Sequence, residues 1–146
     1  MTVSIKRKAA PKIPDRIDLQ IEITPLSFDE MSRTVQGETS AVIRERVIRA
    51  RKIQEERYRD FRDVHCNAQM TTRLLHRFAE PDEAGREMLR EAMNRLQLSA
   101  RAYSRILKVA RTIADLAGSE KVESRHIAEA IGYRNLDRGD WAERGM

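Results

Sequence analysis

The chain has 146 residues, of which 35% are charged and 5% aromatic, with a formal net charge of +5 at pH 7 and a pI of about 9.7. This composition favours a small helical protein with long polar faces over a β-sandwich, and no apolar run approaches the roughly 18 residues that a membrane-spanning helix needs. The single cysteine, Cys66, cannot form an internal disulfide, which points to a reducing compartment. We therefore expect a cytoplasmic protein with no membrane partner, whose basic surface leaves nucleic acid, nucleotide and acidic proteins open as partners.

The amino-terminal part of the chain is predicted to contain an irregular arm, one strand and a short helix. Residues 1–14 are basic and contain two prolines, which predicts an irregular arm. Residues 17–23 alternate apolar and polar side chains, as in a β-strand with one buried face. A capping box of the S-x-x-E type predicts a short helix over 27–33. Because one strand cannot form a sheet by itself, its partner strands are expected outside this sequence.

From residue 38 onward, the apolar spacing predicts helices. Caps, glycines and i, i+3, i+4 periodicity place them at residues 39–62, 71–78, 82–97, 100–117 and 123–131. Residues 135–146 are predicted to be a polar tail. The expected fold class is all-α: a small antiparallel helical bundle over 38–134, preceded by one β-strand and the irregular arm.

The first long helix carries much of the positive charge. Between residues 41 and 62 there are eight basic side chains and four acidic ones. This helix could contact nucleic-acid phosphates. We favour a solvated face, because aromatic residues for base stacking are scarce there and the pairs Glu45–Arg49 and Glu55–Arg59 have the i,i+4 spacing of helix ion pairs.

The sequence contains three residues that are possible metal ligands: His65, Cys66 and His76. Their spacing does not match a zinc finger, and no fourth ligand repeats nearby. We therefore predict no metal, and interpret Cys66 as a small buried apolar residue.

Several motifs resemble one known family. The block LSARAYSRILKVARTIADLAGSEKVESRHIAEAIGYRNLDR, residues 98–138, resembles the end of the magnesium-chelatase-like AAA+ ATPases of the ComM/YifB type. DRIDLQIEI at 15–23, G-E-x-S at 37–40 and the Asn-Ala pair at 67–68 are similar to further elements of that family.

The resemblance implies that residues 15–37 are a remnant of the AAA+ core and residues 38–134 its helical lid. It implies a ring-forming motor that acts on DNA. The partners of this region are then the family's ATPase core and neighbouring subunits, and the parent ATPase uses ATP and Mg²⁺. The phosphate-binding motif G-x-x-x-x-G-K-[ST] does not occur in these residues. This chain alone is therefore expected to bind no cofactor and to hydrolyse no ATP.

The same resemblance implies three candidate site residues. Arg16 falls where the family places its arginine finger, which neutralises charge on the γ-phosphate of a neighbouring subunit's nucleotide. Arg101 matches the family's sensor-2 arginine, at the start of a lid helix where a guanidinium can meet a phosphate. Arg105, one turn later, is a weaker candidate for that surface.

Two other functions stay open at this point. One is a stand-alone helical DNA-binding protein that uses the long basic helix or the last helix, and it predicts salt-dependent DNA binding by this chain alone. The other is the lid of a true metal-chelatase motor subunit, which is supported only by the family relationship.

Overall fold

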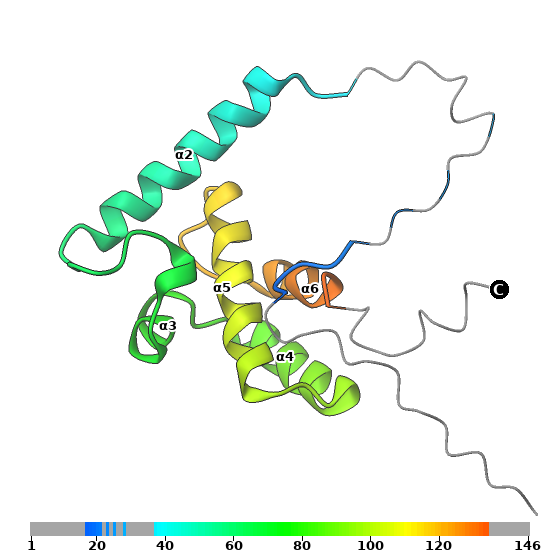
Figure 1. The fold of residues 1–146 in the computed structure, drawn as a ribbon. Helices are drawn as coiled ribbons and strands as arrows, with labels where there is room; N and C mark the ends of the chain where they lie inside the picture. The colour runs from blue at the N-terminus through cyan, green and yellow to red at the C-terminus, as the bar shows by residue number, and fades with distance from the viewer. Residues whose placement is uncertain (1–16, 22, 24, 26–27, 29–36, 135–146) are drawn as a thin grey trace, which may run out of the picture.

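The fold is a helical bundle, seen in a computed structural model that describes residues 17–21, 23, 25, 28 and 37–134 (Figure 1). The predicted all-α class is confirmed, and within 37–134 the only β-type pairing is an isolated bridge between Pro81 and Val122. The elements are α2 (Ser40–Tyr58), the 3₁₀ helix η1 (Asn67–Gln69), α3 (Thr72–Phe78), α4 (Glu83–Leu96), α5 (Ala100–Leu116) and α6 (Ser124–Gly132).

Side chains at the predicted boundaries cap most of these helices. Asp82 Oδ1 accepts a hydrogen bond from Gly85 N at 2.7 Å to begin α4, and Ser99 Oγ accepts one from Ala102 N at 3.2 Å to begin α5. At α6, the buried His126 Nδ1 accepts from Glu123 N at 3.0 Å. Burial lowers the pKa of His126, and the nearby Arg125 charge adds to this, so the imidazole remains neutral and can accept.

The long helix ends earlier than predicted, at Tyr58 rather than near residue 62. The chain turns there, and Phe61 N donates to Tyr58 O at 2.9 Å. The rings of Tyr58, Phe61 and Phe78 then pack edge to face, with centroids 5.8 to 6.3 Å apart. Burying this aromatic cluster outweighs continuing the helix into solvent.

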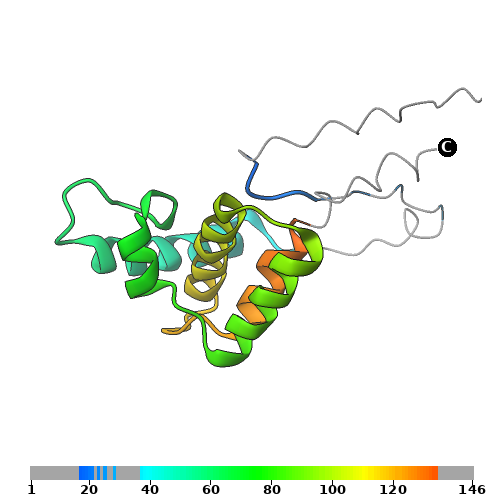
Figure 2. The ribbon, with the colours of Figure 1, turned by 90° about the horizontal axis from the view of Figure 1, so that it is seen from below.

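The core lies around α5, which contacts α2, η1, α3 and α6. Ile106, Ala110 and Ala114 of α5 are fully buried, and so is Ile127 of α6. Figure 2 shows α4 and α6 side by side along one flank of the bundle. Within the parts of the chain that are described, no helix is long and apolar enough to cross a membrane.

The predicted strand at 17–23 is not formed by its described residues, 17–21 and 23. The segment instead lies against the end of α6, where Gln20 N donates to Tyr133 O at 2.9 Å and Arg134 Nη1 donates to Ile17 O at 3.2 Å. A ladder needs a neighbouring strand, and the described residues supply none. The predicted arm and tail lie outside the described residues, as does the short helix at 27–33 apart from Phe28.

Candidate functional site

Three basic residues follow one face of α5. Arg101, Arg105 and Lys108 are spaced by four and three residues, which places them in one row along the helix. Arg101 is exposed in the first turn, directly after the Ser99 cap. Its guanidinium makes no hydrogen bond or ion pair with any residue that the structure describes. This end of α5 therefore combines an open cation with the partial positive charge of a helix amino terminus.

The other two cations of this row are already engaged. Arg105 is partly buried and forms an ion pair with Asp18 of the amino-terminal segment. Lys108 Nζ donates to the carbonyl oxygen of Ala68 at 2.8 Å. Both side chains line a groove whose other walls are Asp18, Leu19, Ala68, Val109, Thr112, Ile113 and Tyr133. The weaker candidate, Arg105, is thus directed towards a carboxylate, whereas Arg101 is not.

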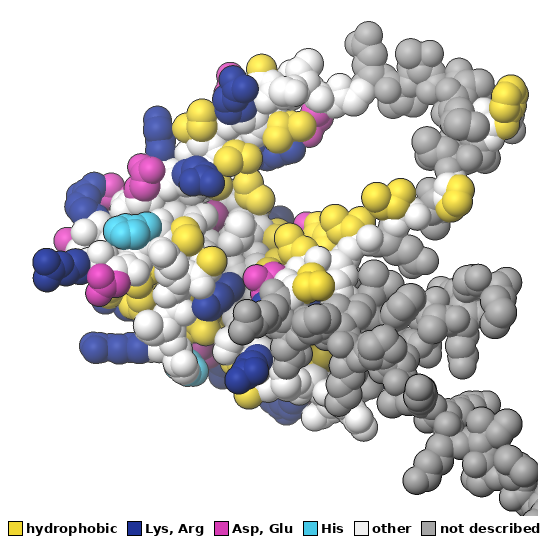
Figure 3. Space-filling view, viewed as in Figure 1, with side chains coloured by type: hydrophobic (Ala, Val, Ile, Leu, Met, Phe, Trp, Pro, Cys, Tyr) yellow, Lys and Arg dark blue, Asp and Glu magenta, His cyan; other side chains and the backbone are white. Residues whose placement is uncertain are grey.

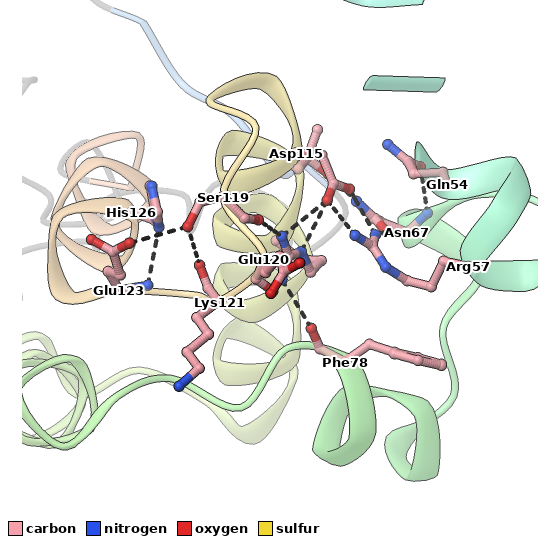
Figure 4. A network of polar contacts seen from close by, with 12 residues as sticks. Gln54, Arg57, Asn67, Phe78, Asp115, Ser119, Glu120, Lys121, Glu123 and His126 are labelled. Atoms are coloured by element: carbon pink, nitrogen blue, oxygen red, sulfur yellow. Dashed lines mark hydrogen bonds and ion pairs between the residues drawn. The ribbon is translucent and has the colours of Figure 1, made fainter. Parts of the chain in front are cut away.

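A buried polar network holds α5 in place against α2 and η1 (Figure 4). The side chain of Asp115 is fully buried and accepts hydrogen bonds from Arg57 Nη1 and Asn67 Nδ2, each at 2.8 Å. Asn67 Oδ1 in turn accepts from Tyr58 OH at 2.8 Å, and Asn67 N donates to Gln54 Oε1 at 2.9 Å. These bonds satisfy the polar groups that the bundle buries at this junction.

Arg111 extends the network to the other side of α5. Its Nε donates to Asp115 Oδ1 at 3.1 Å, and its two Nη atoms reach the carbonyl oxygens of Ser119 at 2.6 Å and Glu120 at 2.8 Å. Burial lowers the pKa of Arg111, and the negative charge of Asp115 opposes that effect. One carboxylate therefore compensates one buried and one partly buried guanidinium group, and Arg111 fixes the loop that leads from α5 to α6.

Sequence reasoning missed most of this network. Arg57 belonged to a helix interpreted as a solvated face, and Asn67 was noticed only through the family resemblance. One signal was present in the sequence: Arg111 and Asp115 form an i,i+4 pair of opposite charge next to Leu107, Ala110 and Ala114 of the apolar face.

Two detailed expectations about charged pairs are wrong. Neither Glu45–Arg49 nor Glu55–Arg59 forms an ion pair; Arg59 pairs with Glu56 instead. On the same helix, Arg46 makes a two-pronged ion pair with Glu38, with distances of 3.0 and 2.9 Å. The α2 charges are thus partly neutralised by neighbours other than those that the spacing indicated.

Arg16 lies outside the described residues. Among the residues that are placed, no three His, Cys, Asp or Glu side chains converge on a possible metal position, His65, Cys66 and His76 included. Cys66 is not buried as expected, but partly exposed, and its Sγ lies 3.7 Å from Gln69 Oε1. It lies in the loop that leads into η1, at the edge of the core.

Comparison with known proteins identifies the family. The family profile "Magnesium chelatase, subunit ChlI C-terminal" matches residues 37–134. The chain is 42% identical over 125 residues to competence protein ComM of Haemophilus influenzae, and 37% identical over 125 residues to the uncharacterised protein YifB of Escherichia coli K12. Each match covers 85% of this chain and 24% of the relative, so the chain spans about a quarter of the length of these relatives. The chain therefore belongs to the magnesium-chelatase-like family of ComM and YifB, and corresponds to its C-terminal domain.

Proposed function

We propose that this chain is the lid of a magnesium-chelatase-like AAA+ ATPase, and that Arg101 contacts the nucleotide phosphates when the ATPase core is present. The observation that carries the proposal is the difference between two arginines on one face of α5. Arg105 is paired with Asp18, whereas Arg101 is exposed at the helix start with no partner among the described residues. A free guanidinium beside a helix amino terminus suits a phosphate.

The rest of the proposed role concerns the whole protein. The core and neighbouring ring subunits supply ATP and Mg²⁺, Arg16 acts as the arginine finger, and this chain alone hydrolyses no ATP. A motor acting on DNA is favoured over metal insertion, because the relative that is 42% identical is named a competence protein. The cytoplasmic location predicted from the composition is part of the same proposal.

The test is a chimera in which this chain replaces the matching region of Haemophilus influenzae ComM. We expect the chimera to bind and hydrolyse ATP, and Arg101→Ala to lower the rate at least about tenfold, since a hydrogen bond to a charged group contributes roughly 1.5–3 kcal/mol. Steady-state hydrolysis and binding of a fluorescent ATP analogue are measured together, so that loss of binding is separated from loss of turnover.

Arg73→Ala is the matched control. Arg73 is also exposed and also occupies the second position of its helix, α3. Its removal should leave both nucleotide binding and hydrolysis unchanged. Equal effects of the two substitutions, or an active chimera indifferent to Arg101→Ala, would exclude the sensor role.

A further inference from the structure

The cap at the beginning of α6 depends on a histidine. Glu123 is the last residue before the helix, and His126 is the third residue within it. In a capping box the side chain at this third position accepts a hydrogen bond from the backbone N–H of the residue before the helix, and it usually belongs to Glu or Gln. Here the acceptor is His126 Nδ1, which lies 3.0 Å from Glu123 N. The cap therefore depends on a lone pair that a proton can occupy.

Only the neutral imidazole can make this bond. Because the backbone N–H of Glu123 is a donor, His126 Nδ1 must be the unprotonated ring nitrogen, and the single ring proton lies on Nε2. An imidazolium has a hydrogen on both nitrogens. Protonation of His126 would direct a second N–H at that of Glu123. This would break the cap and leave the backbone donor without its acceptor.

The ring of His126 is also buried. It is 3% exposed, and its Nε2 has no hydrogen-bond partner among the residues that the structure describes. A positive charge at such a position is costly, because water cannot solvate it. The other two histidines of the chain, His65 and His76, are exposed, and histidine side chains are visible on the surface in Figure 3. His126 is therefore the histidine whose charge the interior would have to hold.

Charged groups act on His126 from its own helix, from the residue before the helix and from α5. Burial has the largest influence on the pKa of His126 and lowers it, and the nearby Arg125 acts in the same direction. Glu123 raises this pKa, Arg111 of α5 lowers it, and Glu129 raises it. The two carboxylates do not offset burial and the two guanidinium groups, so the balance favours the neutral ring.

Other features of this junction leave that balance unchanged. The Glu123 carboxylate is paired with Arg125, whose Nε lies 3.1 Å from Oε2. At the beginning of α4, which packs on α6, the Asp82 carboxylate caps its own helix. Figure 4 shows the Lys121 side chain pointing away from His126. The carboxylates of Glu123 and Asp82 thus already have partners.

We propose that His126 is a proton-sensitive cap: its neutral ring holds the beginning of α6, and proton uptake releases this helix from the bundle. Release has wide consequences, because α6 packs on both α4 and α5. Directly after the helix, Tyr133 O also accepts a hydrogen bond from Gln20 N at 2.9 Å. The cap is independent of the proposed nucleotide contact, since Arg101 lies at the beginning of α5.

The direction of the pH dependence follows from proton linkage. The pKa of His126 is lower in the folded chain than the ordinary value of about 6.5, so the unfolded chain takes up the proton first. The contribution of His126 to stability is therefore fully present above about pH 6.5 and is lost as the pH falls below that value. For one proton, the equilibrium constant for folding falls by at most about tenfold per pH unit.

Urea denaturation of the whole chain at about pH 7.5 and about pH 5 measures this loss. The wild-type chain is compared with His126→Gln, because glutamine provides an acceptor at this position of the cap but takes up no proton. The equilibrium constant for folding of the wild type should fall by about tenfold more than that of His126→Gln. His65→Gln removes an exposed histidine and should behave as the wild type. Equal pH dependence of all three chains, or an equal reduction in both variants, would overturn the proposal.

An NMR titration of the wild-type chain decides the case if His126→Gln does not fold. The ring signal of His126 should titrate below about pH 6.5, and the protection factors of amides 124–132 against hydrogen exchange should fall over the same pH range. A ring that titrates at or above about pH 6.5 in the folded chain would overturn the proposal. So would protection factors that stay constant while the ring titrates.

Discussion

Asp115 is the residue on which the interior of the bundle most depends. Two buried or partly buried guanidinium groups, from Arg57 and Arg111, share its single carboxylate, and Asn67 donates to it as well. Burial makes each unpaired cation costly, so these interactions act chiefly by avoiding uncompensated charge. The carboxylate joins α5 to α2 and η1, and through Arg111 it also orders the loop before α6.

Removing this carboxylate should destabilise the protein strongly. Asp115→Ala leaves Arg57 and Arg111 without a counterion, and we expect the free energy of unfolding to fall by about 3–5 kcal/mol in urea denaturation. The comparison is Glu56→Ala, which breaks the exposed ion pair with Arg59. That change should cost less than about 1 kcal/mol, as exposed ion pairs usually do. Similar losses from the two variants would show that the Asp115 network is not a buried unit.

At the scale of elements, α4 and α6 are joined at their beginnings by close backbone contact. Pro81 and Val122 form a β-bridge, and Asp82 N donates to Val122 O at 3.0 Å. The contact is close enough to require glycine at position 85: a Cβ there would lie 2.8 Å from Asp82 Oδ1 and 3.2 Å from Ile127 Cγ1. The capping oxygen of α4 and a fully buried core side chain would both have to move.

Gly85→Ala should therefore destabilise the protein, although alanine is the better helix former by about 1 kcal/mol. Overpacking of this kind costs roughly 1–3 kcal/mol, which we expect as a lower midpoint in urea denaturation. Gly132→Ala is the control, since no atom lies within 4 Å of a Cβ built there. It should be neutral or stabilising, and the opposite order of the two midpoints would contradict the packing argument.

At the scale of the whole molecule, the net charge of +5 does not by itself make a DNA-binding surface. Several cations are committed to intramolecular partners: Arg57 and Arg111 to Asp115, Arg105 to Asp18, and Lys108 to a carbonyl oxygen. These four cations are therefore less available to nucleic-acid phosphates.

The isolated chain should accordingly bind duplex DNA only weakly and without sequence preference. Fluorescence anisotropy should give a Kd no tighter than the non-specific range of about 10⁻⁴–10⁻⁶ M at physiological salt, weakening further as salt rises. Two duplexes of equal length and unrelated sequence serve as the comparison. Nanomolar affinity, or a clear preference for one duplex, would instead support the stand-alone DNA-binding alternative.

Local signals in the sequence predicted the helices and most of their boundaries, although not the end of α2. Ser99 caps the helix that it was expected to begin, and the apolar period of residues 100–117 predicted the buried face of α5. These features depend on residues three or four positions apart, so a linear pattern contains them. The family was predicted from contiguous motifs for the same reason.

Only the tertiary structure decided which charges are buried and which remain open. Arg57 and Asp115 are 58 residues apart, and Arg105 and Asp18 are 87 apart. No periodicity links such positions, and an arginine in a basic helix has the same local pattern whether it meets solvent or a buried carboxylate. Their pairing follows from how the helices pack, because burial makes an unpaired charge costly and selects arrangements that compensate it. That packing leaves Arg101 without a partner among the described residues.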